Sequence, residues 1–316
     1  MAKLLPLAGG DYYAWKYLPS LPASIVFCVL FGILTIAHSY RLYVNRLWFC
    51  IPFVVGGILE IIGYAARAVC YYNTDKLGAY IVQNLCLLLP PALFSASIYM
   101  VLKRTILAVR GSHYSIIPVK WLTRLFVIGD VFTFWVQGGG GGLMASNSLA
   151  NTGEKIVVGG LVLQVILFGL FCATAITFHY RFKTHSVGAV SSSGAAIPWE
   201  RILYMLYGSS VLIMVRSIFR VVEFAMGQNG YPLSHEWTLY VFDTVPMFIV
   251  MVIFFVWYPG SLDPSASDST HGRDAENGNI RDVNGDNWHG SGGTETDASQ
   301  DNRYVQMEAL KPNERR

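Results

Sequence analysis

Charged residues are scarce in this chain. Of its 316 residues, 14% are Asp, Glu, Lys or Arg, whereas 53% are hydrophobic. An average soluble domain carries about 25% charged residues, so a water-exposed surface is hard to build from this composition. The first 20 residues also lack a Lys/Arg-led apolar core followed by a small-residue cleavage site, which argues against a removable signal peptide. The sequence therefore predicts an integral membrane protein whose first span acts as its targeting signal.

Motifs of several catalytic and binding classes are missing as well. The five-glycine run at 138–142 is not followed by Lys and Ser or Thr and joins no strand to a helix, so it indicates close helix approach or a flexible connection and not a phosphate loop. The seven histidines are dispersed without metal-ligand spacing, and the five cysteines lie scattered in apolar segments. We therefore predict no ATP-driven pump in this chain alone, no metal, no cofactor, no enzyme activity and no nucleic-acid binding.

Long apolar stretches are what the sequence has in abundance. A spanning helix takes about 20 mostly apolar residues, and such stretches occur at approximately 21–39, 47–70, 79–102, 122–143, 156–178, 202–224 and 238–258. The expected fold class is an all-α integral membrane protein, with a bundle of seven transmembrane helices over residues 21–260. An extracellular segment, residues 1–20, precedes this bundle.

Lysine and arginine gather in alternate connections between these stretches. The connections after the first, third and fifth spans contain Arg41, Arg46, Lys103, Arg104, Arg110, Lys120, Arg181 and Lys183. The other connections are poor in basic residues. Because short cytoplasmic loops accumulate Lys and Arg, we predict that the N-terminus lies outside and the C-terminus in the cytoplasm.

The composition changes near residue 261. Residues 263–316 contain 11 Asp or Glu against 6 Lys or Arg and almost no aliphatic side chains. Such a segment cannot bury enough apolar surface to offset the chain entropy lost on folding. We predict that residues 261–316 form a disordered, acidic cytoplasmic tail.

Ionisable and amide side chains interrupt the apolar stretches. They are Glu60, Arg67, Gln83, Asn84, Asp130, Gln137, Gln164, Arg216, Arg220, Glu223 and Asp243. Each ionisable group costs about 2.5 to 3.5 kcal/mol on insertion, so such groups normally face the bundle interior. The predicted orientation places most of them in the outer half of the membrane. Two interpretations follow: a polar cavity that receives a polar or zwitterionic headgroup, or internal ion pairs that hold the helices together.

A proline pair stands in the third stretch. Pro90 and Pro91 lie one to two turns from Gln83 and Asn84, and proline removes backbone hydrogen bonds and kinks a helix. We predict a kink here, beside the polar residues, that acts either as a static bend or as a hinge.

Taken in order, several segments resemble one known family. They are Glu60-Ile-Ile-Gly-Tyr-Ala-Ala-Arg67, then Gln83-Asn-Leu and Leu-Leu-Leu-Pro-Pro-Ala-Leu-Phe-Ser-Ala-Ser-Ile-Tyr99, then Asp130 with Gln137 and its glycines, Gly159-Gly-Leu-Val-Leu-Gln164, Arg216-Ser-Ile-Phe-Arg-Val-Val-Glu223, and finally Glu236, Tyr240 and Asp243. Over about residues 20 to 260 the chain resembles the fungal lipid-translocating exporters, a seven-span family named for resistance to aminocholesterol. The resemblance brings no catalytic residues with it.

This resemblance implies a multi-pass protein, often of the plasma membrane, that exports sphingoid bases and other amphiphiles. The predicted function is therefore export or transbilayer translocation of sphingoid-base-like or amino-sterol-like lipids, giving resistance to toxic lipids or drugs. Its partners would be membrane lipids or amphiphilic small molecules. The alternative is a seven-span receptor or regulator of a membrane lipid-stress response, although the Asp-Arg-Tyr and Asn-Pro-x-x-Tyr motifs common in G-protein-coupled receptors are absent.

Overall fold

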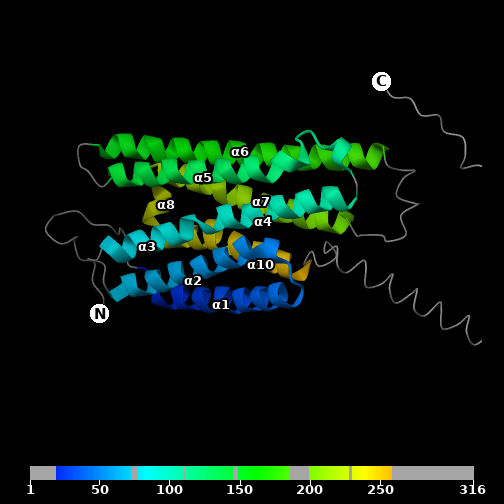
Figure 1. Ribbon diagram of the computed structural model, residues 1–316. Coiled ribbons are helices and arrows are strands. Elements are labelled where there is room, and N and C mark those ends of the chain that lie inside the picture. Colours follow the sequence, from blue (N-terminus) through cyan, green and yellow to red (C-terminus); the bar gives the residue numbers. More distant parts are fainter. Residues whose placement is uncertain are drawn as a thin grey trace, which may run out of the picture. The chain divides into compact units, whose positions relative to one another are not determined.

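The structure, a computed structural model, describes residues 19–72, 77–109, 111–144, 149–185, 199–227 and 230–257. Over these ranges the chain is helical and contains no strand, which confirms the predicted all-α class. Figure 1 shows the long helices lying side by side. The pair α1 and α2 forms one flank, the pair α5 and α6 forms the other, and α4, α7 and α10 lie between them. The expected extracellular segment up to residue 18 and the expected tail at 261–316 lie outside the described residues.

The helices follow the predicted stretches with a few interruptions. Their bounds are α1 Leu21–Val44, η1 Trp48–Cys50, α2 Ile51–Tyr72, α3 Leu77–Leu88, α4 Pro90–Ala108, η2 Ser112–Tyr114, α5 Val119–Met144, α6 Ala150–His185 and α7 Trp199–Ala225. The last stretch consists of the short helices α8 Tyr231–Ser234 and α9 Glu236–Leu239, the π-helical turn η4 Tyr240–Thr244, and α10 Val245–Val256.

Six helical segments, and not the seven predicted, are long and apolar enough to cross a membrane by length and composition. They are Leu21–Val44, Trp48–Tyr72, Ile81–Ala108, Asn151–Thr184, Trp199–Ala225 and Glu236–Val256. The protein is thus a multi-pass membrane protein. The stretch predicted at 122–143 does form a helix, α5 of 26 residues, but it is not among the six. Asp130, Gln137 and the glycines at 138–142 make it less apolar than the others.

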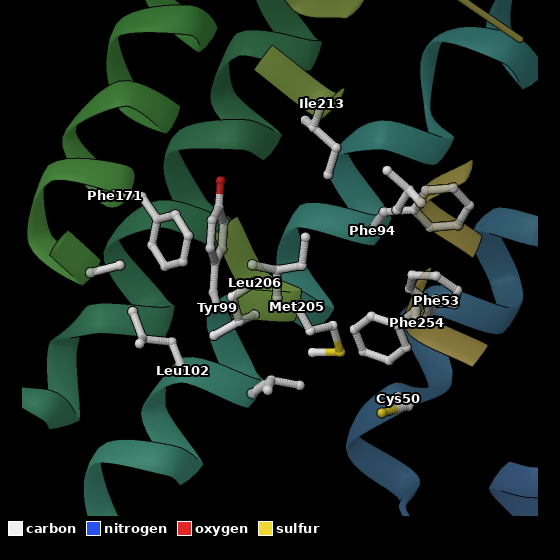
Figure 2. Close-up of a cluster of buried hydrophobic side chains, with 14 of the residues drawn as sticks. Cys50, Phe53, Phe94, Tyr99, Leu102, Phe171, Met205, Leu206, Ile213 and Phe254 are labelled. Atoms are coloured by element: carbon white, nitrogen blue, oxygen red, sulfur yellow. The ribbon is translucent and has the colours of Figure 1, made fainter. Parts of the chain in front are cut away.

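Apolar side chains occur on both the inside and the outside of the bundle. Phe53 stacks on Phe94 and on Phe254, with ring centroids 4.5 and 4.3 Å apart. Figure 2 shows this group beside Met205 of α7, within the same buried cluster as Tyr99. Outward-facing residues such as Ile36, with 72% of its surface exposed, are equally apolar. Because lipid removes most of the hydrophobic drive between helices, close packing and polar contacts must hold them together.

Glycines allow that close packing at the contact between α2 and α3. A Cβ atom added at Gly63 would lie 2.6 Å from Cδ2 of Leu87, which is closer than side-chain atoms approach. At the contact between α5 and α6 the backbones themselves approach. A Cβ at Gly153 would lie 2.6 Å from the backbone oxygen of Gly140. The glycine run at 138–142 is continuous helix in the structure, and its buried member Gly140 makes this approach possible.

The proline pair coincides with a helix break. Helix α3 ends at Leu88 and α4 begins at Pro90, and Leu89 between them retains helical angles of φ −74° and ψ −38°. Pro90 and Pro91 have no backbone N–H, so two i to i−4 hydrogen bonds are missing there. Two carbonyl groups of α3 are therefore deprived of their helical partners, and the predicted kink stays a prediction.

Candidate functional site

Most of the predicted polar residues are buried in the bundle. Glu60, Arg67, Gln83, Asp130, Gln137, Arg216, Arg220, Glu223 and Asp243 are buried. Gln164 is partly buried, whereas Asn84 lies on the exposed face of α3 and does not join the interior set. The buried residues belong to α2, α3, α5, α7 and η4, and the structure does not bring them into one group. It places all of them except Glu60 and Gln83 in three separate groups.

The first group, here called the central network, consists of Arg216, Arg220, Glu223 and Asp243. The three residues of α7 are spaced at i, i+4 and i+7, which places them on one helix face. Arg220 pairs with Glu223 at 2.8 Å and with Asp243 at 2.6 Å, and Arg216 is in ion-pair contact with the same aspartate. Asp243 thus receives both guanidinium groups and joins the last membrane segment to α7.

Asp243 is presented by the π-helical turn η4. A π turn inserts one extra residue per turn, which changes the direction of the side chains that follow, and such turns are frequent at functional sites. Within this single turn Tyr240 and Asp243 face different polar groups, and Oγ1 of Thr244 lies 2.5 Å from the hydroxyl of Tyr64. Pro246, two residues after the turn, lacks the N–H that a regular helix would use. The turn and the proline together fix three polar contacts to neighbouring helices.

Arg216 also reaches the break between α3 and α4. Its Nη2 donates a hydrogen bond to the backbone carbonyl of Leu87. In an unbroken helix that carbonyl would accept from the N–H of residue 91, which is proline here. The guanidinium therefore replaces the missing backbone donor and connects the central network to the proline pair.

A second group joins the start of α1, the end of α2 and the last membrane segment. Arg67, fully buried, forms an ion pair of 2.7 Å with Glu236 and donates from Nε to the Tyr240 hydroxyl at 3.2 Å. Both carboxylate oxygens of Glu236 accept from the backbone N–H of Ser20, at 2.8 and 3.0 Å. This carboxylate thus caps the first turn of α1 from another part of the chain.

The third group lies along α5. The hydroxyl of Tyr99 on α4 donates to Oδ2 of Asp130 at 3.0 Å, and Nε2 of Gln137 donates to Oε1 of Gln164 on α6 at 3.0 Å. These contacts attach α5 to its two neighbours. They account for Asp130 and Gln137 as helix-pairing groups, and neither residue contacts the central network in any hydrogen bond or ion pair between described residues.

Glu60 differs from all of these acids. It is 2% exposed and makes no hydrogen bond or ion pair with any residue that the structure describes. Arg216, Arg220 and Asp243 interact with it electrostatically from α7 and η4. Gln83 is also 2% exposed, and its buried Oε1 has no hydrogen-bond partner. Among the described residues, the Glu60 carboxyl on α2 and the Gln83 carbonyl oxygen on α3 therefore have no hydrogen-bond partner.

Sequence reasoning missed several members of these groups. Tyr64, Tyr99, Tyr240 and Thr244 carry hydroxyls that complete the contacts, and their interior role has no signal beyond a polar tip in an apolar stretch. Glu236 was detectable, because it stands at the start of the last stretch as the only acid between Glu223 and Asp243. Among the described residues no group of three or more His, Cys, Asp or Glu is placed to hold a metal ion.

Comparison with known proteins gives consistent matches. The profile of a family described as RTA1 like protein matches residues 53–265. Protoporphyrin uptake protein 1 of Saccharomyces cerevisiae is 35% identical, over 78% of this chain and 91% of that protein. Protein RTA1 of the same yeast is 33% identical, over 80% and 87% of the two chains. The yeast Sphingoid long-chain base transporter RSB1 is 25% identical, over 77% and 72%. No solved structure matches.

Proposed function

Since this chain belongs to the RTA1 like protein family, we propose that it moves amphiphilic lipids of the sphingoid-base or amino-sterol kind across the membrane and so gives resistance to toxic lipids or drugs. Two relatives support this proposal by name, one as a sphingoid long-chain base transporter and one as a protoporphyrin uptake protein. Both names describe the movement of amphiphiles, and neither describes a catalysed reaction. The family supports membrane lipid transport in general, and the substrate class is our inference from the site.

The observation that carries the proposal is an unpaired acid inside the bundle. Ion pairs that merely hold helices together would leave no buried carboxyl without a partner, because each unpaired polar group raises the cost of insertion. Glu60 is such a carboxyl, next to the central network. An ammonium headgroup offers the charge and the N–H donors that this carboxyl lacks. The hydrocarbon chain of the same amphiphile would remain in lipid between apolar helix faces.

We further propose that α5 is a seventh span. Its outward face carries Leu125, Ile128, Phe132 and Trp135, whose exposed fractions range from 50% to 75%. Side chains of this kind are costly to expose to water and are favourable against lipid. The polar face of the same helix, with Asp130 and Gln137, points inward to α4 and α6.

The distribution of charge supports an N-terminus outside and a C-terminus in the cytoplasm. The end of the bundle that holds the connections α1–α2, α4–α5 and α6–α7 carries Glu200 and the basic residues Arg41, Arg46, Lys103, Arg104, Lys120, Arg124, Arg181, Lys183 and Arg201. The opposite end has few basic residues. Cytoplasmic loops accumulate such residues, and we place the protein in the plasma membrane with this basic end inside.

The test is transbilayer movement of a fluorescent long-chain base in liposomes that contain the purified protein. We expect protein-dependent movement that falls at least tenfold in Glu60→Gln and is retained in the matched control Asn84→Ala, which changes an exposed amide on α3. Movement no faster than in protein-free liposomes, with long-chain bases and with amino-sterols alike, would refute the proposal and favour the receptor-like alternative. Equal movement in wild type and Glu60→Gln would refute the role of the carboxyl alone.

A further inference from the structure

The charges around Glu60 do not balance. The central network contains two guanidinium groups, Arg216 and Arg220, and two carboxylates, Glu223 and Asp243, so its formal charges sum to zero. Glu60 adds one carboxyl to this neutral set. Because uncompensated charge is costly inside a bilayer, the site requires one monovalent positive group whenever it is shielded from water.

The other titratable groups near Glu60 already have defined states or partners. Both arginines remain protonated in proteins, and Asp243 is held by both of them. On α2 the hydroxyl of Tyr64 is engaged with Thr244, and on α3 the neighbour is the thiol of Cys86, a weak donor. Glu60 is thus the one carboxyl near the central network whose proton can be exchanged without breaking an ion pair or hydrogen bond between described residues.

Glu60 lies close to a helix that is already interrupted. Helix α3 contacts α2 closely at Gly63, one turn from Glu60, through Leu87 and Cys86. This is the turn of α3 that precedes Pro90 and lacks regular helical hydrogen bonds. Arg216 donates a hydrogen bond to the Leu87 carbonyl there. A positive charge that binds beside Glu60 would therefore interact electrostatically with the guanidinium that makes this hydrogen bond.

We propose that Glu60 is an exchange site that holds either one proton or the ammonium headgroup of one amphiphile, so that binding of the amphiphile releases one proton. This inference rests on the proposed function and specifies its substrate class and its coupling. In the empty site the carboxyl is neutral, with its proton on one oxygen. When the ammonium binds, the O–H bond breaks, the proton passes to water, and the carboxylate accepts hydrogen bonds from the headgroup. Net charge in the site is the same in both states, and the exchange couples amphiphile movement to an opposite flow of protons.

The experiment measures protons released on binding. Purified wild-type protein in weakly buffered, sodium-free solution receives a fluorescent long-chain primary alkylammonium amphiphile. Below about pH 8 its amine is fully protonated, as a lysine amine is, so it supplies the N–H donors and any proton released on binding comes from the protein. We expect about one proton released per amphiphile bound, read with a pH-sensitive dye, and none from Glu60→Gln. Glu200→Gln, an exposed acid on α7, is the matched control and should release protons as the wild type does.

A second measurement uses the wild type alone, so that it does not depend on the folding of any variant. If one proton competes with the amphiphile, the apparent Kd rises about tenfold for each pH unit lowered through the range in which the site is protonated. Binding with no proton release and with a Kd independent of pH would overturn the exchange site. Movement of the same amphiphile across liposomes at equal pH on both sides tests the proposed function separately, because that movement requires no proton gradient and can succeed where the exchange site fails.

Discussion

Arg216 donates a hydrogen bond to the backbone carbonyl of Leu87, the group that loses its helical donor because residue 91 is proline. One side chain therefore forms an ion pair with Asp243 and also donates to the carbonyl that the interrupted helix leaves unpaired. In lipid no water is present to satisfy such a carbonyl, so its protein partner is required for insertion. The central network and the α3–α4 break are thus a single structural unit.

This relationship predicts non-additive mutations. Arg216→Met leaves Asp243 with one guanidinium and the Leu87 carbonyl with no donor, and loss of one partner from a buried pair costs about 3 to 5 kcal/mol. Pro91→Ala returns a backbone N–H to that carbonyl, so Arg216→Met should be milder in the Pro91→Ala background by about 1 kcal/mol. A double-mutant cycle on unfolding in detergent measures this coupling. Additive effects of the two changes would show that the carbonyl does not depend on Arg216.

Exchanging the charges of the ion pair Arg67–Glu236 should not restore stability. Glu236 also accepts from the backbone N–H of Ser20, so Glu236→Gln keeps an acceptor and should cost less than Glu236→Leu, which loses the cap as well as the pair. Loss of a helix cap costs about 0.5 to 2 kcal/mol. The swap Arg67→Glu with Glu236→Arg restores opposite charges but offers no acceptor to Ser20. Thermal unfolding in detergent should show that the swap remains less stable than Glu236→Gln, and full recovery by the swap would contradict the capping role.

Helix positions and the polar residues could be predicted from the sequence because both depend on local composition. Runs of apolar residues defined every long helix, and interior charges such as Arg67 and Asp243 were recognised because lipid exposure is so costly. Pairing could not be predicted, since Glu236 and Ser20 lie 216 positions apart and meet only after the bundle forms. The π turn at Tyr240–Thr244 likewise has no local signal, and it decides which direction Asp243 faces.

Two sequence expectations changed for identifiable physical reasons. Depth along the membrane was used to group the polar residues, but Gln83 is buried and its neighbour Asn84 is exposed, because consecutive residues lie about 100° apart around a helix. Asp130 was grouped with Glu60 as an interior polar residue, yet it binds Tyr99 and not the central network. The depth of a residue in the membrane follows from the topology of the spans. Its contact partners depend on how each helix is rotated about its own axis. The apolar pattern predicts this rotation poorly when both faces of a helix are apolar.

The glycines of the α5–α6 contact predict opposite effects for two similar substitutions. In Gly153→Ala the new Cβ would lie 2.6 Å from the Gly140 oxygen and 2.7 Å from the Met144 nitrogen, both backbone atoms that cannot turn away. Separation of the two helices should cost about 1 to 3 kcal/mol. Gly139→Ala, on the exposed face of α5, meets no atom within 4 Å and should stabilise by about 0.5 to 1 kcal/mol through helix propensity. The measurement compares the unfolding temperatures of the two variants with that of the wild type in one detergent. Equal destabilisation by both would contradict the packing of α5 against α6.

The proposed seventh span predicts that the two ends of α5 lie on opposite sides of the membrane. His113 in η2 precedes α5 and Leu149 follows it, and both side chains are exposed. The five native cysteines are buried or partly buried, so a single added cysteine can be followed against them. With a membrane-impermeant maleimide on intact cells, Leu149→Cys should react directly, whereas His113→Cys should react only after permeabilisation. Reaction of both from the same side would mean that α5 lies within the bundle without crossing the bilayer. The reverse labelling pattern would confirm that α5 spans the membrane but would invert the orientation of the bundle. Glu60 and the central network would then lie nearer the inner leaflet. An exporter would have to collect its amphiphile from that leaflet.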